Sequence, residues 1–130
     1  MDIRVYYEDT DCGGVVYYAN YLKYFERART HYLEDHGLSV ADLLREGTEF
    51  RVIRAELAYR SAAAYGEILT IDTVVAADRR LSLTFSHIMK DRPTQRLIVE
   101  GSATLVAVDM NGKVKRIPPF LLEALKIAPS

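Results

Sequence analysis

A short turn containing two aspartates and two glycines constrains this chain most, because it joins a β-prone segment to the aromatic start of a helix. Residues 7–21 read Tyr-Glu-Asp-Thr-Asp-Cys-Gly-Gly-Val-Val-Tyr-Tyr-Ala-Asn-Tyr, and the two aspartates are Asp9 and Asp11. A carboxylate on such a turn lies close to the unpaired backbone N–H groups of the helix that follows. This pairs a nucleophile or base with oxyanion donors, the two parts that acyl transfer requires.

Length and composition predict a single domain over residues 1–130, large enough for a core but too small for two. The net charge of −1 indicates no attraction to nucleic acid or to an anionic membrane. The longest apolar runs have about five residues, far below the length that crosses a bilayer, and no signal peptide is apparent. The lone cysteine, Cys12, excludes an internal disulfide and a multi-thiolate metal site. We expect a cytoplasmic protein without metal.

The spacing of apolar residues predicts an α+β fold with one long helix and several antiparallel strands. Asn20 is expected to cap the long helix, which runs to about His36 and ends at Gly37. A shorter helix follows Ser39 and stops at Gly47. Strands are predicted at residues 3–8, 50–60, 67–77, 81–90 and 96–108, a hairpin turn at 109–113, a return strand at 114–117 and a terminal helix at 120–127.

The three histidines are expected to be structural. His31 and His36 lie five residues apart in the predicted helix, which is poor spacing for a shared metal ion. His87 falls in the apolar register of its strand, whose inward face is predicted to carry Leu81, Leu83, Phe85, His87 and Met89. Cys12 adjoins a carboxylate, which raises a thiol pKa, so we expect a turn residue and not a nucleophile.

The acidic turn has three interpretations besides acyl transfer. A calcium loop counted from Asp9 would have Asn20 where the bidentate glutamate belongs, and would need a helix before it. A phosphatase with an Asp-x-Asp motif would need a parallel sheet, which strands linked by hairpins do not form. The third is an inert turn in which Asp9 or Asp11 caps backbone amides, and it stays open on the residues alone.

The turn and the helix after it resemble the signature of the 4-hydroxybenzoyl-CoA thioesterase branch of the hot-dog superfamily. The likeness is densest over residues 4–30 and is greatest to the short acyl-CoA thioesterases associated with the Tol-Pal system. It rests on the following segments: 11–17, 20–21, 25–29, and, at looser spacing, Tyr59, 66–67 and 116–118. The resemblance implies a hot-dog fold, in which a curved antiparallel sheet wraps one long central helix, and hydrolysis of an acyl-CoA thioester without a cofactor.

The resemblance also implies roles for particular residues. Asp11 stands at the position of the catalytic aspartate, and the backbone N–H of Tyr18 would polarise the thioester carbonyl, with Gly14 and Val15 completing the catalytic turn. The Tol-Pal-associated members carry histidine where this chain has Tyr18, so a backbone role is expected and an imidazole role is not. The residues expected to bind substrate and CoA are Tyr17, Asn20, Tyr21, Arg60, Arg79, Arg80 and Ser82. The arginines are candidates because a guanidinium makes paired hydrogen bonds to phosphate.

The residues fit thioester hydrolysis without histidine, because an aspartate is ionised at neutral pH and a thiolate leaves without a proton donor. Two rival functions remain. The first is a non-catalytic module that binds acyl-CoA or an acyl carrier. The second is a hot-dog dehydratase of 3-hydroxyacyl thioesters, for which His31 is the placed histidine. Apolar residues on both faces of the strands at 68–76 and 98–108 predict a homodimer, or a tetramer formed as a dimer of dimers.

Overall fold

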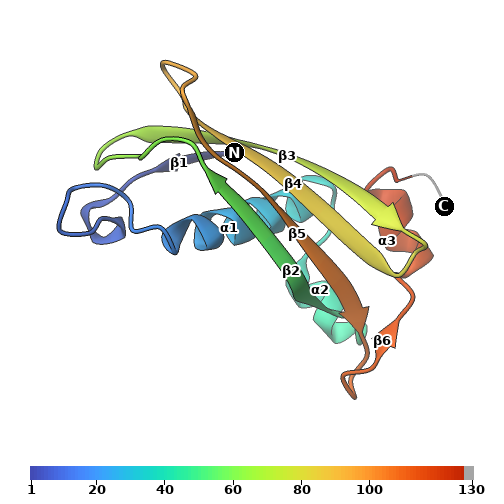
Figure 1. The fold of residues 1–130 in the computed structure, drawn as a ribbon. Coiled ribbons are helices and arrows are strands. Elements are labelled where there is room, and N and C mark those ends of the chain that lie inside the picture. Colours follow the sequence, from blue (N-terminus) through green and yellow to red (C-terminus); the bar gives the residue numbers. More distant parts are fainter. Residues whose placement is uncertain (128–130) are drawn as a thin grey trace.

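The chain forms one curved antiparallel sheet with a long helix lying along its inner face (Figure 1). The structure is a computed structural model and describes residues 1–127. Its elements are β1 (Asp2–Arg4), the 3-10 helix η1 (Tyr7–Asp9), α1 (Asn20–Asp35), α2 (Val40–Arg45), β2 (Glu49–Tyr59), β3 (Ile68–Asp78), β4 (Ser82–Asp91), β5 (Leu97–Val108), β6 (Val114–Lys115) and α3 (Pro119–Ala124). This arrangement confirms the α+β prediction.

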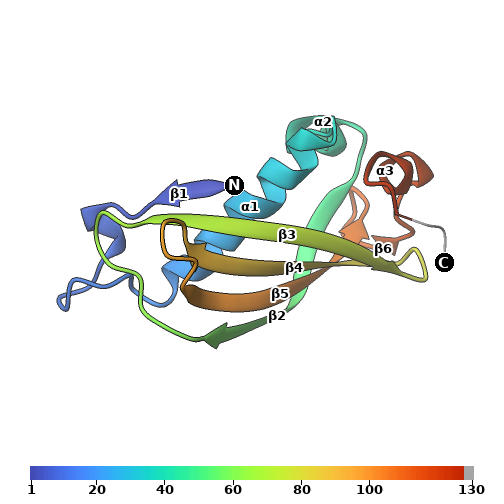
Figure 2. The ribbon, with the colours of Figure 1, turned by 90° about the horizontal axis from the view of Figure 1, so that it is seen from above.

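The sheet order is β1-β3-β4-β5-β2, and the short β6 pairs with β5. Figure 2 shows β3, β4, β5 and β2 side by side, with α1 crossing one face of the sheet. The register places Ser82 of β4 opposite Val106 of β5, and Val106 opposite Arg51 of β2. The turn between β3 and β4 is therefore level with the first residues of β2, at the end of the sheet away from the acidic turn (Figure 1).

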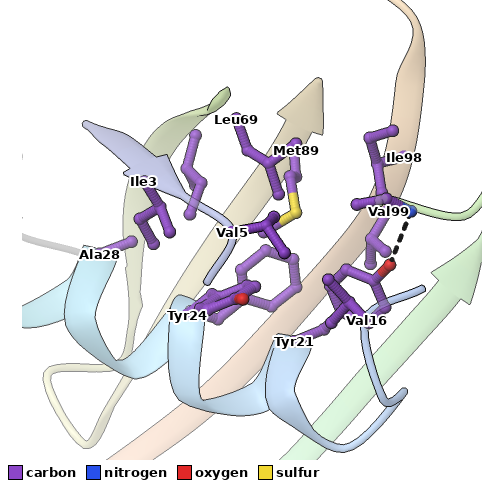
Figure 3. Packing of buried hydrophobic residues seen from close by; sticks show 13 residues of the cluster. Ile3, Val5, Val16, Tyr21, Tyr24, Ala28, Leu69, Met89, Ile98 and Val99 are labelled. Carbon is purple, nitrogen blue, oxygen red and sulfur yellow. Dashed lines mark hydrogen bonds between the residues drawn. The ribbon is translucent and has the colours of Figure 1, made fainter. Parts of the chain in front are cut away.

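The inner face of the sheet is covered by α1 because the helix carries apolar residues at intervals of three and four. The helix residues that are buried are Tyr21, Tyr24, Phe25, Ala28 and Leu33. Several of them pack against Leu69 of β3, Met89 of β4 and Ile98 of β5 (Figure 3). The predicted alternation is confirmed within β4, since Leu83, Phe85, His87 and Met89 are buried and their neighbours are not. Leu81 was wrongly placed on this face, because it lies in the turn before β4 and is 42% exposed.

The helix approaches the sheet closely at Gly101 of β5. A Cβ atom there would lie 2.7 Å from the backbone oxygen of Glu56 and 2.8 Å from Cε2 of Phe25. The ring of Phe25 also stacks on His87, with centroids 4.6 Å apart. The missing side chain at position 101 thus allows an aromatic residue of α1 to lie directly on the strand.

The prediction of a strand over residues 3–8 was wrong beyond Arg4. The backbone turns into η1, where Oδ2 of Asp9 accepts a hydrogen bond from the N–H of Tyr6 at 3.0 Å. A local side-chain acceptor of this kind competes with strand pairing. The helix α1 also begins one residue earlier than predicted, at Asn20, because Ala19 and not Asn20 is the N-cap.

The C-terminal elements are shorter than predicted. The return strand ends at Lys115, and the N–H of Ile117 instead donates to the backbone oxygen of Arg80 at 2.8 Å. The helix α3 begins at Pro119 and ends at Ala124, before Lys126 takes a left-handed conformation with φ of 57°. The other strands, and α2 with its Ser39 cap, lie within one or two residues of the predicted positions.

The strand β2 forms one edge of the sheet and carries apolar residues that face solvent. Val52 and Ile53 are 49% and 62% exposed, and β5 is the neighbour of β2 in the sheet. Nε of Arg54 donates to Oε1 of Glu56 on the same strand at 2.9 Å. An edge with eleven residues and exposed apolar side chains is a site for pairing with another strand.

Across residues 1–127, no helix has both the length and the apolar character that spanning a membrane requires.

Candidate active site

The acidic turn is a small hairpin fixed to the loop before β3. Thr10 pairs with Val16, the N–H of Asp11 donates to the oxygen of Val15 at 2.9 Å, and the N–H of Gly14 donates to the oxygen of Asp11 at 3.2 Å. Gly14 has a φ of 79°, a conformation that residues with side chains rarely adopt. The N–H of Val16 donates to the oxygen of Ala63 at 2.8 Å. The turn is therefore held in one conformation by backbone bonds.

The two aspartates of the turn have different roles. Asp9 is structural, because Oδ2 caps η1 and its backbone oxygen accepts from the N–H of Tyr17 and from Nδ2 of Asn20, both at 2.9 Å. Asp11 is exposed, and Oδ1 accepts from the N–H of Gly13 at 2.7 Å. The second carboxylate oxygen of Asp11 has no hydrogen bond within residues 1–127. Asp11 thus has an oxygen available for a substrate or a water molecule.

The start of α1 supplies backbone donors beside this turn. The N–H groups of Asn20, Tyr21 and Leu22 donate to the oxygens of Tyr17, Tyr18 and Ala19. Those of Tyr18 and Ala19 have no acceptor in the part of the chain that the structure describes. The N–H of Gly14, by contrast, is occupied within the turn. Of the two predicted donors, Gly14 and Tyr18, only Tyr18 therefore has an N–H that is free to bind an oxyanion. Backbone N–H groups at a helix start commonly lack an acceptor.

Tyrosines surround this helix start. The rings of Tyr17 and Tyr18 are 4.9 Å apart, and a hydrogen bond between their side chains raises the pKa of the Tyr17 hydroxyl. Tyr18 is 62% exposed and meets Tyr59 edge to face at 6.4 Å. Tyr21 is different: it is buried, burial raises its pKa, and its hydroxyl oxygen accepts from the N–H of Ala63 at 3.2 Å (Figure 3). Tyr17, Tyr18 and Tyr59 can contact a ligand, whereas Tyr21 positions the loop.

The arginines expected to hold CoA phosphates lie at two places. Arg60 follows Tyr59 at the same end of the sheet as the acidic turn, and its Nε donates to Oε2 of Glu100 at 3.0 Å. Arg79 and Arg80 occupy the β3–β4 turn, both with positive φ, and Ser82 begins β4. Figures 1 and 2 both show this turn beside α3, at the opposite end of the sheet. One chain alone does not bring these three residues to Asp11.

None of the histidines is part of this site. Nε2 of His31 lies 3.3 Å from Oδ2 of Asp35 on the exposed side of α1, which leaves the dehydratase alternative without a placed histidine. His87 is 1% exposed, and burial together with the nearby charge of Arg29 lowers its pKa to about 4. Its Nδ1 lies 2.9 Å from Oγ1 of Thr73. No group of three metal-ligating side chains occurs within residues 1–127, and Cys12 is exposed on the turn.

A cavity of about 440 Å³ lies farther along α1, between that helix, α2 and the sheet. Its lining is mostly apolar and consists of Leu33, Val40, Leu43, Leu44, Phe50, Val52, Leu83, Phe85 and Leu105, with Glu26, Arg29, Thr30, Thr48 and Glu49 as the polar members. This cavity was not predicted from the sequence, and Arg29 was named there only within the segment 25–29, without a role. The spacing held a signal, since Arg29 follows the buried Phe25 by one helical turn and so lies on the same side of the helix.

Comparison with known proteins places the chain in a family. A profile described as the thioesterase-like superfamily matches residues 5–125. The acyl-CoA thioester hydrolase YbgC of Escherichia coli O6:H1 is 35% identical over 125 residues, which cover 95% of this chain and 92% of that protein. The acyl-CoA thioesterase YbgC of Haemophilus influenzae is 34% identical over 88% of this chain and 83% of its own length.

Solved structures have the same fold. The DHNA-CoA thioesterase from Staphylococcus aureus superposes with a TM-score of 0.90 at 28% identity, and the match covers 97% of this chain and 87% of that one. The hot-dog arrangement implied by the sequence is thereby confirmed, and the matched residues 5–125 include both the acidic turn and α1. This chain belongs to the thioesterase-like superfamily.

Proposed function

We propose that this chain hydrolyses acyl-CoA thioesters at the acidic turn. The observation that carries the proposal is the free carboxylate oxygen of Asp11 beside the open N–H of Tyr18 at the start of α1. A carboxylate and an oxyanion donor on adjoining segments are the two groups that acyl transfer needs. The 35% identity to an acyl-CoA thioester hydrolase supports the same reaction.

The chemistry follows from these two groups. Asp11 either attacks the carbonyl carbon, after which water opens the anhydride, or takes a proton from a water molecule that attacks. In both cases the carbonyl oxygen becomes negative and accepts a hydrogen bond from the N–H of Tyr18. The C–S bond then breaks, and CoA leaves as a thiolate that takes its proton from solvent. The chain needs no metal or other cofactor for any of these steps, and CoA enters as part of the substrate.

We further propose that the site is completed by a second copy of the chain paired through β2. Antiparallel pairing of two β2 edges about Ala55 places Arg54 opposite the partner's Glu56, and the symmetric pair forms at the same time. The exposed Val52 and Ile53 become covered. Opposite charges facing each other across two strands stabilise the pair and fix its register. The smallest assembly is thus a homodimer, and two such dimers could form a tetramer.

This pairing resolves the separation of the arginines from Asp11. Tyr59 of one chain comes beside the partner's Arg51, which is level with the partner's Ser82 in the sheet. The strand β2 of one chain and the strand β4 of the partner are separated by three strand spacings, or roughly 14 Å. The partner's Arg79 and Arg80 therefore lie at the same end as Asp11, Tyr18 and Arg60. CoA phosphates reach these arginines across the interface and not within one chain.

A hydrolysis screen tests the catalytic proposal. Release of the CoA thiol is followed over short-chain, long-chain and aromatic CoA esters, and binding of each ester is measured by calorimetry. Thiol release that follows enzyme concentration supports hydrolysis. Binding without release would identify the non-catalytic module instead. The cytoplasmic location expected from the sequence is tested separately by cell fractionation.

A charge exchange tests the interface. Arg54→Glu should convert the dimer to a monomer, because it places like charges opposite each other in both symmetric positions. The double variant Arg54→Glu with Glu56→Arg restores opposite charges and should restore the dimer. Light scattering reports the mass of each. A native protein that is monomeric at micromolar concentration and fully active would contradict the proposal.

A further inference from the structure

One charged side chain in the cavity along α1 has no partner. Arg29 is half-buried, and burial lowers the pKa of its guanidinium. Within residues 1–127 it makes no hydrogen bond and no ion pair, whereas Arg54 and Arg60 each pair with a carboxylate. A guanidinium has five N–H donors, and a partly desolvated one without acceptors is costly.

The groups around Arg29 leave its guanidinium without a direct partner within residues 1–127. His87 is close enough for the charge of Arg29 to lower its pKa, and the buried Nε2 of His87 also lacks a hydrogen bond there. Glu26 lines the same cavity, and its charge partly offsets the effect of burial on the pKa of Arg29, but the two form no ion pair. Glu49 is paired with Arg51 at 3.7 Å, and Leu83 and Phe85 form apolar walls on the sheet side. The guanidinium of Arg29 therefore has donors available for a group from outside the chain.

The cavity is placed to receive part of a substrate. Phe50 and Val52 line it at the first half of β2, and the β2 pairing proposed above brings the partner's Tyr59 and Tyr18 to that half. At ~1.5 Å per residue, Arg29 lies roughly 14 Å along α1 from the helix start of its own chain. In the proposed dimer, the cavity therefore serves the thioester held by the partner's Asp11. A volume of about 440 Å³ is within the range of small-ligand pockets.

We infer that Arg29 determines which acyl groups the enzyme accepts, and that it selects acyl chains ending in a carboxylate. This inference rests on the proposed thioesterase function. The apolar walls contact the methylene groups, and the guanidinium binds the terminal carboxylate through paired hydrogen bonds. A plain alkyl chain fills the same space but removes the remaining water from Arg29 without replacing its hydrogen bonds. Selectivity thus has two sources: the hydrogen bonds between Arg29 and a terminal carboxylate, and the cost of dehydrating Arg29 when a plain alkyl chain binds.

Two esters of equal carbon number test the inference. Adipoyl-CoA and hexanoyl-CoA both carry six carbons, and only adipoyl-CoA ends in a carboxylate. The native protein should favour adipoyl-CoA in kcat/KM by at least about tenfold. Arg29→Met should reverse the preference, because the substitution keeps an unbranched apolar stem and removes the charged head. Arg29→Lys should retain the direction with a smaller ratio, since an ammonium cannot make the paired bonds.

Control variants separate this role from folding and from catalysis. Arg27→Met removes a charge from the exposed side of the same helix and should leave the adipoyl-to-hexanoyl ratio unchanged. Thermal unfolding of each variant checks that it is folded, and Arg29→Gln replaces the methionine variant where that one is unstable. Affinities of the two esters for Asp11→Asn, measured by calorimetry, give the ratio without turnover. A native protein that binds the two esters in the expected ratio but hydrolyses neither would count against the proposed function alone.

The inference is overturned by either of two results. One is a native protein that binds and hydrolyses hexanoyl-CoA as well as or better than adipoyl-CoA. The other is an Arg29→Met variant that is folded and keeps the native ratio in both kcat/KM and affinity. A ratio that changes equally in Arg27→Met would also overturn it, because the effect would then come from overall charge and not from the cavity.

Discussion

The start and the middle of α1 differ in almost every physical respect. At the start, Tyr17 and Tyr18 are largely exposed, Asp11 faces solvent, and backbone N–H groups lack acceptors. In the middle, Tyr24 and Phe25 are no more than 2% exposed and lie against the sheet. The middle holds the fold together, and the start keeps polar groups available for a ligand. Changes at the two places should therefore affect different properties.

The largest expected effect is at the start of the helix and on activity alone. Asp11→Asn keeps the size of the side chain and the bond from Gly13, but removes the charge that acts in the proposed reaction. We expect kcat to fall by at least about 10³-fold, with little change in affinity for the ester, because the lost interaction belongs to the transition state. The free energy of unfolding should change by no more than about 1 kcal/mol.

Asp9→Asn is the matched control for this change. It weakens a cap on η1 in the same turn and should cost stability of about 1 kcal/mol while retaining most activity. Steady-state kinetics and urea unfolding of both variants give the comparison. If Asp11→Asn were as active as Asp9→Asn, the role of Asp11 in the reaction would have to be abandoned.

The second effect is on stability, in the middle of the helix. Gly101→Ala adds a Cβ that would lie 2.8 Å from Phe25 and 2.7 Å from the backbone of β2, so helix and strand must separate. Overpacking of this kind typically costs about 3 kcal/mol. Urea unfolding measures the loss, and kcat per folded molecule should stay near the native value. Gly37→Ala is the control: its positive φ costs about 1 kcal/mol, but no atom lies within 4 Å of the added Cβ.

The third effect concerns pH and again the middle of the molecule. His87 has a folded pKa of about 4, below the ordinary value of 6.5, so the unfolded chain takes up a proton first as the pH falls. The contribution of neutral His87 to the free energy of unfolding is complete above pH 6.5, declines between pH 6.5 and 4, and is lost below pH 4. This contribution is at most about 3 kcal/mol. His87→Gln cannot titrate.

Unfolding by urea at pH 7, 5.5 and 4.5 tests this prediction. The difference in stability between the native protein and His87→Gln should shrink as the pH falls, whereas His31→Gln should follow the native curve, because His31 is exposed on the outer side of α1. Parallel curves for His87→Gln and the native protein would mean that His87 is protonated equally in the folded and unfolded chains.

The middle of the molecule was also the part that the sequence predicted best. Apolar spacing of three and four in α1, and of two in β4, reports directly which side is buried, so the bounds of both were close to those observed. The acidic turn was identified from residue types. Which of its two aspartates caps the backbone could not be predicted, because that depends on where η1 turns after Arg4.

Long-range placement explains the remaining differences. Arg79 and Arg80 were predicted as phosphate ligands from their type, yet their distance from Asp11 depends on the direction of β3 and, in the proposed dimer, on the partner chain. The cavity beside Arg29 is formed by α1, α2 and strands far apart in the sequence. A local pattern cannot report an empty space between elements, or a missing hydrogen-bond acceptor.

The smallest expected effect returns to the start of the helix, at the residue where a side chain and a backbone role can be separated. Tyr18→Phe removes the hydroxyl that bonds Tyr17 and keeps the backbone N–H and the ring that meets Tyr59. If the N–H of Tyr18 stabilises the oxyanion, kcat should fall by less than about tenfold, or ~1.4 kcal/mol. Stability should hardly change, because Tyr18 is largely exposed.

Tyr17→Phe removes the other hydroxyl of the pair and serves as the control in the same assay. An inactive but folded Tyr18→Phe, beside an active Tyr17→Phe, would show instead that the phenol itself takes part in the reaction and that the side chain, not the helix start, makes this end of α1 catalytic.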